Sequence, residues 1–134
     1  MPSIDPRPGQ MKAALASVPP GVPVVMLNLL KFRDKAEYPD QFSDLTGKQA
    51  YSIYSKQALQ HVQAIGGEVV MMAKACAGII APEDEQWDEM LLVRYPSIEK
   101  FVAMVMNPDY QKFTVHRTAA LADSRLIATV EKGR

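Results

Sequence analysis

Three polar residues lie in or beside apolar stretches of the sequence, where they could act on a small molecule: Asn28, Lys74 and Arg94. An amide and two cations in an apolar wall suit a ligand with an anionic or carbonyl group. We expect all three on the sheet face away from the helices, with Asn28 and Arg94 polarising a carbonyl or enolate and Lys74 contacting the ligand. Alternatively, Lys74 and Arg94 lie in solvent or pair with Glu68 and Asp88. A register shift of one residue would move the set to the other face.

A second group of candidates lies in the segment 47–65, which has helical periodicity. Tyr54 and His61 are seven residues apart, which is two helical turns, so a hydroxyl and an imidazole would share one helix face. On this hypothesis Tyr54 moves a proton and Tyr51 contacts the ligand. The alternative is that both tyrosines pack with their hydroxyls at the helix margin and that His61 is solvated.

A third group lies near the end of the chain, where His116 and Arg117 are adjacent. His116 is the second candidate for proton transfer, and Tyr110 is a candidate ligand contact. Arg117 falls on the same apolar stripe as Tyr110 and Phe113, where a charge requires a partner. We expect a buried ion pair or a contact with a carbonyl group, and anion binding by Arg117 is the alternative.

Metal, cofactor and nucleophile motifs are not recognisable in the sequence. The two histidines, His61 and His116, are far apart, and no Cys or His stands at ligand spacing. No P-loop, dinucleotide fingerprint or Gly-x-Ser-x-Gly motif occurs. We therefore expect neither a metal nor a cofactor. The one cysteine, Cys76, cannot form an intramolecular disulfide, which suits a reducing cytoplasm.

The overall composition indicates an ordinary globular chain. The 134 residues include 15 Lys and Arg and 15 Asp and Glu, so the formal net charge is zero. A nucleic-acid phosphate backbone attracts a concentrated positive surface, which this balance does not supply. The longest apolar run, 22–30, is too short to span a bilayer. We expect a cytoplasmic protein without nucleic-acid or membrane partners.

The elements that would position these residues follow a β-α-β-β-α-β order. Six of the ten prolines precede residue 24, so residues 1–21 are expected to form an arm with one short helix, 10–17. Residues 22–134 are expected to form one domain. Its predicted elements are strands 22–32, 68–76, 87–95 and 125–131, a helix 47–65, and a second helix that starts after Ser97 and is split at Pro108. A lid, if there is one, is expected in the loop 33–46.

This order predicts an α+β, ferredoxin-like fold, in which two helices cover one face of a four-stranded antiparallel sheet. The strands are apolar on both faces, however, and an antiparallel sheet with one wet face alternates apolar and polar residues. The uncovered face therefore needs a partner. The simplest partner is a second copy of the chain, packed sheet to sheet as a homodimer.

Four segments of the sequence resemble domain-of-unknown-function family 1330, which belongs to the dimeric α/β-barrel proteins. They are 26–32, 51–67, 94–97 and 108–126. The resemblance spans about residues 22–131 and implies the same fold and dimer. The positions that match the family pattern are Asn28, Tyr51, Tyr54, Arg94, Tyr110, His116 and Arg117.

The resemblance implies no particular reaction, because the family has none assigned. The wider superfamily includes cofactor-free monooxygenases, lactone isomerases, haem enzymes and binding or stress proteins, and fold does not choose among them. Two hypotheses stay open. One is a small-molecule-binding protein, or a cofactor-independent monooxygenase- or isomerase-like enzyme, acting on a small carbonyl or anionic compound. The other is a non-enzymatic binding or stress module with a fully packed interior.

Overall fold

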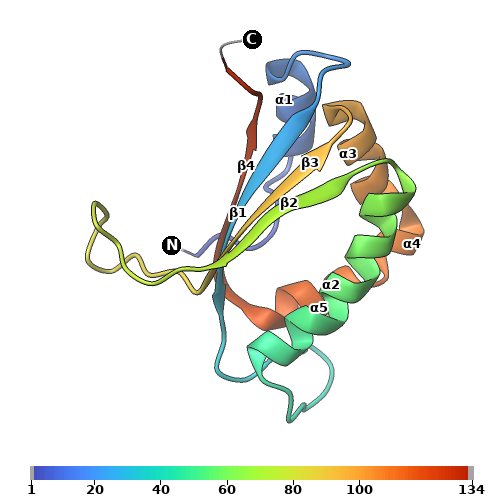
Figure 1. The fold of residues 1–134 in the computed structure, drawn as a ribbon. Coiled ribbons are helices and arrows are strands. Elements are labelled where there is room, and N and C mark those ends of the chain that lie inside the picture. Colours follow the sequence, from blue (N-terminus) through green and yellow to red (C-terminus); the bar gives the residue numbers. More distant parts are fainter. Residues whose placement is uncertain (1, 133–134) are drawn as a thin grey trace.

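The computed structural model describes residues 2–132 and contains one four-stranded antiparallel sheet. The strand order β2-β3-β1-β4 places β1 and β3 in the centre and β2 and β4 at the edges. Helices α2 to α5 cover one face, and the other face is open (Figure 1). This is the predicted ferredoxin-like arrangement.

The observed elements agree closely with the predicted ones. They are α1 (Gln10–Ser17), β1 (Val24–Phe32), α2 (Gly47–Ala64), β2 (Glu68–Lys74), β3 (Glu89–Tyr95), α3 (Ile98–Met106), α4 (Pro108–Gln111), α5 (Thr114–Ala120) and β4 (Leu121–Thr129). The last strand is the largest difference, because it begins at Leu121 and not at Arg125. Leu121 is fully buried opposite Phe32. The helix therefore ends at Ala120 and the chain enters the sheet directly.

Local signals in the sequence account for the helix boundaries. Thr46 forms a capping box with Gln49 at the start of α2, and Ser97 accepts a hydrogen bond from the Lys100 amide at the start of α3. Pro108 stands at the first turn of α4, where its missing N–H costs nothing. These caps fix where each helix begins relative to the sheet.

The helix-covered face of the sheet carries the core. Val24, Met26 and Leu30 alternate along β1 and are at most 3% exposed. On the opposite face, Leu27 pairs with Leu92 and Ile127, and the side chain of Ile127 is 49% exposed. One face is thus buried within the chain, while the other is apolar and uncovered.

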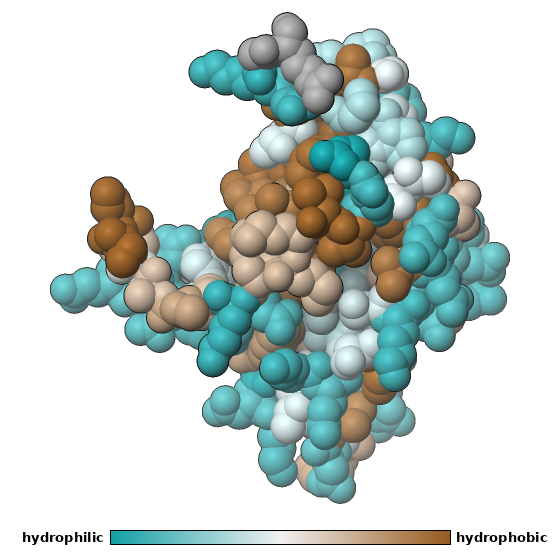
Figure 2. All heavy atoms as spheres, viewed as in Figure 1, coloured by the Kyte–Doolittle hydropathy of each residue, from teal (hydrophilic) through white to brown (hydrophobic). Residues whose placement is uncertain are grey.

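Between β2 and β3 the chain forms a loop, 75–88, that extends away from the body (Figure 1). Ile79 and Ile80 in this loop are 89% and 98% exposed, and apolar side chains are visible at its end (Figure 2). The base of the loop is fixed to β1, because the Phe32 amide donates to the Asp88 carboxylate at 2.8 Å. Among the described residues, no helix is long and apolar enough to cross a membrane.

Candidate functional site

A cluster of tyrosines lies between the helices and the sheet. Tyr51 and Tyr54 are one turn apart on α2, face the sheet and are 9% and 8% exposed. The hydroxyl groups of Tyr54 and Tyr110 are hydrogen-bonded to each other, and their rings meet edge to face. Two hydroxyls that share one hydrogen bond retain a second proton, which can be donated to a ligand oxygen.

The buried tyrosines favour hydrogen-bond donation over proton abstraction. Burial raises the pKa of Tyr51 and of Tyr110 far above the usual phenol value, and the neighbouring Tyr54 raises both further. The positive charge of Arg117 acts in the opposite direction on both pKa values. Tyr51 and Tyr110 are therefore neutral at physiological pH, beside a cation, which suits the stabilisation of an oxyanion.

Arg117 contacts the N-terminal segment of the chain. Its side chain is only 14% exposed, and its guanidinium donates to the backbone carbonyl of Ile4. The same group lies 3.4 Å from the hydroxyl of Ser124 on β4 and 3.9 Å from the carboxylate of Asp5. The carbonyl contact expected for Arg117 is thus present, but its partner lies more than a hundred residues earlier in the chain.

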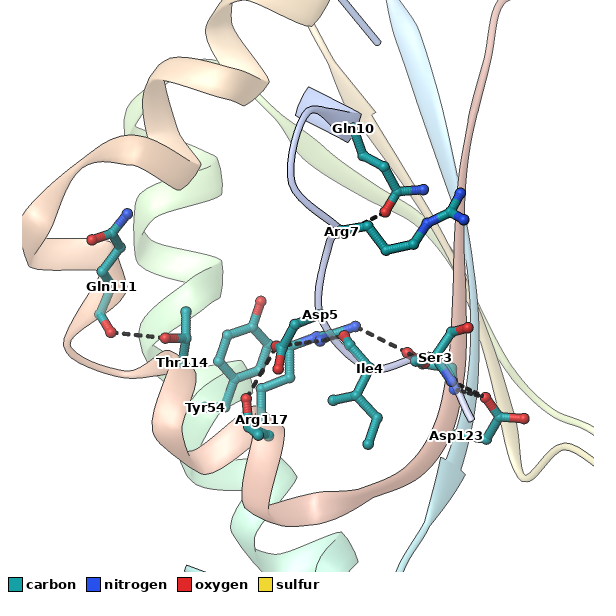
Figure 3. Close-up of polar contacts among 12 residues, drawn as sticks. Ser3, Ile4, Asp5, Arg7, Gln10, Tyr54, Gln111, Thr114, Arg117 and Asp123 are labelled. Atoms are coloured by element: carbon teal, nitrogen blue, oxygen red, sulfur yellow. Dashed lines mark hydrogen bonds and ion pairs between the residues drawn. The ribbon is translucent and has the colours of Figure 1, made fainter. Parts of the chain in front are cut away.

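Residues 3–5, which we call the tail, lie between α5 and β4 (Figure 3). The hydroxyl of Ser124 donates to the Ser3 carbonyl at 2.6 Å, and the hydroxyl of Thr118 donates to the Asp5 carboxylate at 3.2 Å. The Ile4 side chain is partly buried against the core. The tail therefore presents two carbonyl oxygens and one carboxylate to donors from α5 and β4.

Next to the tail is a groove of about 640 Å³. Asp5 lines it together with residues of α1, α3 and α4 and with Thr114, one turn before Thr118 on α5. Its volume is in the range of small-molecule sites. A second hollow of about 340 Å³, lined by Cys76 and Trp87, lies in the loop 75–88, which extends away from the helices.

The predicted grouping of Asn28, Lys74 and Arg94 on the open face is wrong. Asn28 alternates with the buried Met26 and Leu30, so it points towards the helices and not away from them. Its side-chain amide donates to the Met26 carbonyl at 3.3 Å. Both faces of β1 are apolar, so alternation along this strand does not show which face meets the helices.

Lys74 and Arg94 lie on opposite faces of the sheet, because the pairing between β2 and β3 is irregular. Arg94 does point away from the helices, but it is exposed and forms an ion pair with Glu68, as the alternative interpretation stated. The pairing between β2 and β3 shifts between Val69 and Met71, and Lys74 lies opposite Glu89, in phase with the helix-covered face. The irregularity in β2 gives no clear signal in its sequence.

The two histidines lie apart from each other. The hydroxyl of Tyr38, in the loop 33–46, lies 2.6 Å from Nδ1 of His116. His116 therefore faces this loop, whereas Arg117 faces the tail. The rings of His61 and Tyr110 meet edge to face, with 5.8 Å between centroids, so Tyr110 contacts both Tyr54 and His61. Among the described residues, no group of three or more His, Cys, Asp and Glu could hold a metal ion.

Several residues of this site were missed in the sequence. Ser124 pairs with the buried Leu30 and shares the helix-covered face with Leu121 because the pairing between β1 and β4 shifts between Lys31 and Phe32, an irregularity that alternation in the sequence does not reveal. Ile4 and Asp5 gave no signal, because their partners are distant in the chain. The cluster consists of Tyr51, Tyr54 and Tyr110, Arg117, Ser124 and the tail, and Asn28 lies on the same face of the sheet as Ser124.

The fold and this cluster define a ferredoxin-like α+β protein with a buried group of tyrosines and an arginine between its helices and its sheet. The chain belongs to the family described as Domain of unknown function (DUF1330), whose model matches residues 41–130. The chain is also similar to RPA0582, a protein of unknown function from Rhodopseudomonas palustris. The two are 35% identical over 100% of both chains, with a TM-score of 0.90.

More distant structures share the fold alone. A DABB family protein from Mesorhizobium loti with a ferredoxin-like fold is 11% identical, with a TM-score of 0.52 over 83% of this chain and 98% of that one. The hydroxynitrile lyase from Passiflora edulis is 12% identical, with a TM-score of 0.53 over 86% of this chain and 99% of that one. No curated protein matches the chain.

Proposed function

We propose that the interior between sheet and helices binds a small organic molecule that carries a carbonyl or carboxylate group. The observation that carries this proposal is the contact of Arg117, a mostly buried cation, with a carbonyl oxygen, close enough to Tyr51 and Tyr110 for its charge to lower their pKa values. A guanidinium and a phenol are both donors, so this end of the site favours oxygen acceptors. Asn28 lies on the same side of the sheet and could add an amide.

The protein is proposed to act as a cytoplasmic homodimer that pairs through the open face of the sheet. Leu27, Leu92 and Ile127 would be buried in that interface, which matches the two-faced apolar pattern of the strands. Residues 22–134 would form the domain, and residues 1–21 an arm whose tail closes the site.

If the protein is an enzyme, the residues support cofactor-independent chemistry of the monooxygenase or isomerase type. Arg117 and the tyrosine pair would stabilise negative charge on a carbonyl or enolate oxygen. The structural likeness to a hydroxynitrile lyase supports only the ability of this scaffold to carry an enzyme. The alternative, a non-enzymatic binding or stress module, is favoured by the Ile4 side chain that packs against the core.

Native mass spectrometry of freshly purified protein tests both parts of the proposal, because it reports the oligomeric state and any retained molecule. We expect a dimer with added mass that is lost in Arg117→Gln and reduced in Tyr54→Phe. Tyr38→Phe is the matched control, because it removes a tyrosine hydroxyl that contacts α5 outside the cluster. Retention unaffected by Arg117→Gln, or lost equally in the control, would contradict the proposed site. Thermal melts check that each variant is folded.

A further inference from the structure

The tail has the features of a molecule bound at the Arg117 end of the site. Its Ser3 and Ile4 carbonyl oxygens and its Asp5 carboxylate contact donors of Ser124, Arg117 and Thr118. Its one apolar side chain, Ile4, is partly buried against the core. These contacts connect segments 113 and 121 residues apart, so the tail fills a position formed by the rest of the fold.

We infer that residues 3–5 occupy the ligand position and compete with a short branched carboxylate, an inference that rests on the proposed small-molecule site. A carboxylate meets the donor set, because its two oxygens can accept from a guanidinium and from a neighbouring hydroxyl. The Asp5 carboxylate, 3.9 Å from the Arg117 guanidinium, already brings a negative charge to this point. The branched alkyl group follows from Ile4, which has a sec-butyl side chain.

The spacing within Ile4 identifies a suitable probe. In this residue one carbon separates the carbonyl that accepts from Arg117 and the sec-butyl group that packs against the core. The same single carbon separates the carboxylate and the sec-butyl group of 3-methylpentanoate. This compound therefore presents the carbonyl and the side chain of Ile4 with a full negative charge. Its neutral analogue, 3-methylpentanamide, keeps the shape and removes the charge.

The adjoining groove gives the displaced tail and the incoming molecule room to exchange. Asp5 lines both the groove and the Arg117 end, and the groove of about 640 Å³ is bounded by the end of α3 and by Gln111 of α4. While the tail occupies the ligand position, a ligand cannot bind there. The apparent affinity of the ligand therefore falls in proportion to the fraction of molecules whose tail is displaced. Weakening the tail should therefore strengthen binding, an outcome not expected if the tail only supports the site.

The test measures the affinity of 3-methylpentanoate for the full chain by isothermal titration calorimetry. We expect Ile4→Gly/Asp5→Ala to bind at least tenfold more tightly than the wild type, and Ser17→Ala, a change in the same arm away from the tail, to match the wild type. The amide should bind at least tenfold more weakly than the carboxylate. In methyl NMR spectra, the Ile4 signal should shift on addition of the carboxylate, while the signal of the exposed Ile79 should not.

Equal affinity of the wild type and the tail variant would overturn the competition, and equal binding of amide and carboxylate would overturn the ligand class. Absence of carboxylate binding to every variant would overturn the inference as a whole. These failures are distinct from failure of the proposed function. The proposed function fails if Arg117→Gln does not abolish retention of the molecule that the purified protein carries. Circular dichroism checks that the tail variant, whose changed residues lie outside the helices and strands, keeps its fold.

Discussion

At the scale of single residues, two polar groups of opposite charge hold the tail against the fold. Arg117 binds the Ile4 carbonyl, and Asp123 on β4 accepts from the Ser3 amide at 2.8 Å. Burial by itself would raise the pKa of Asp123, but hydrogen bonds from Ser3, Arg125 and the Ser124 amide outweigh it and hold this pKa below its usual value. The ionised carboxylate is therefore the form that binds the tail.

The first prediction concerns the pH dependence of this contact. Because the pKa of Asp123 is lower in the folded protein, its stabilising contribution is complete well above pH 4 and is lost as the pH falls through the folded-state value. We expect Asp123→Asn to lower the free energy of unfolding by about 1–2 kcal/mol at pH 7. The difference in unfolding free energy between Asp123→Asn and the wild type should narrow below about pH 4. Urea unfolding at several pH values measures it.

The control for this prediction is Asp40→Asn, a change at an exposed residue of the loop 33–46. Its effect at pH 7 should remain within about 0.5 kcal/mol, as is usual for surface substitutions. A gap between Asp123→Asn and wild type that widened on acidification would show that the carboxylate does not stabilise the fold in its ionised form.

At the scale of the elements, the position of α2 depends on the close packing of its first turn against the chain at Arg33 and the end of α5 at Ala120. A Cβ atom on Gly47 would lie 2.2 Å from the Arg33 carbonyl oxygen and 2.6 Å from that of Ala120. The Gly47 amide donates to the Arg33 carbonyl, and the Arg33 amide donates to the Ala120 carbonyl. Glycine is therefore required where the first turn of α2 meets the end of α5, and this contact positions the tyrosines relative to Arg117.

The second prediction is that Gly47→Ala destabilises the protein by about 1–3 kcal/mol, because backbone atoms must move to admit the methyl group. Ser52→Ala, on the exposed face of the same helix, is the control and should change stability by less than about 0.5 kcal/mol. The midpoint of urea unfolding measures both effects. A Gly47→Ala protein as stable as Ser52→Ala would show that the three segments are not in close contact.

At the scale of the whole molecule, the open sheet face and the loop 75–88 are the main apolar surfaces left uncovered. Ile127 lies near the end of β4 on the open face and is 49% exposed, while Ile79 and Ile80 are almost completely exposed. Among the described residues, no helix covers this face (Figure 1). The apolar residues of this face, Leu27, Leu92 and Ile127 among them, are what the proposed homodimer would bury.

The third prediction tests this interface. Ile127→Glu should raise the dissociation constant of the homodimer at least tenfold, because a carboxylate would be buried without a partner. Val115→Glu is the matched control, since Val115 is 41% exposed but lies on α5, on the other side of the sheet. Analytical ultracentrifugation measures the constants. Equal constants for the two variants would contradict pairing through the open face, and a monomeric wild type would contradict the dimer.

Much of the fold could be predicted from the sequence because its signals are local. Thr46, Ser97 and Pro108 mark helix starts through contacts with residues a few positions away. The phase of a strand is different, because it depends on which face meets the helices. The face predicted for Asn28 is wrong because β1 is apolar on both faces, and alternation alone does not distinguish them.

The sequence by itself determined the order of the elements, the ferredoxin-like sheet and the family, because periodicity and capping act over short distances. Only the tertiary structure decided which polar residues meet. It separated Arg94 from Asn28 and brought Arg117 to Ser124 and to the tail. Contacts between residues more than a hundred positions apart leave no local pattern, because they are fixed by how the packed layers align.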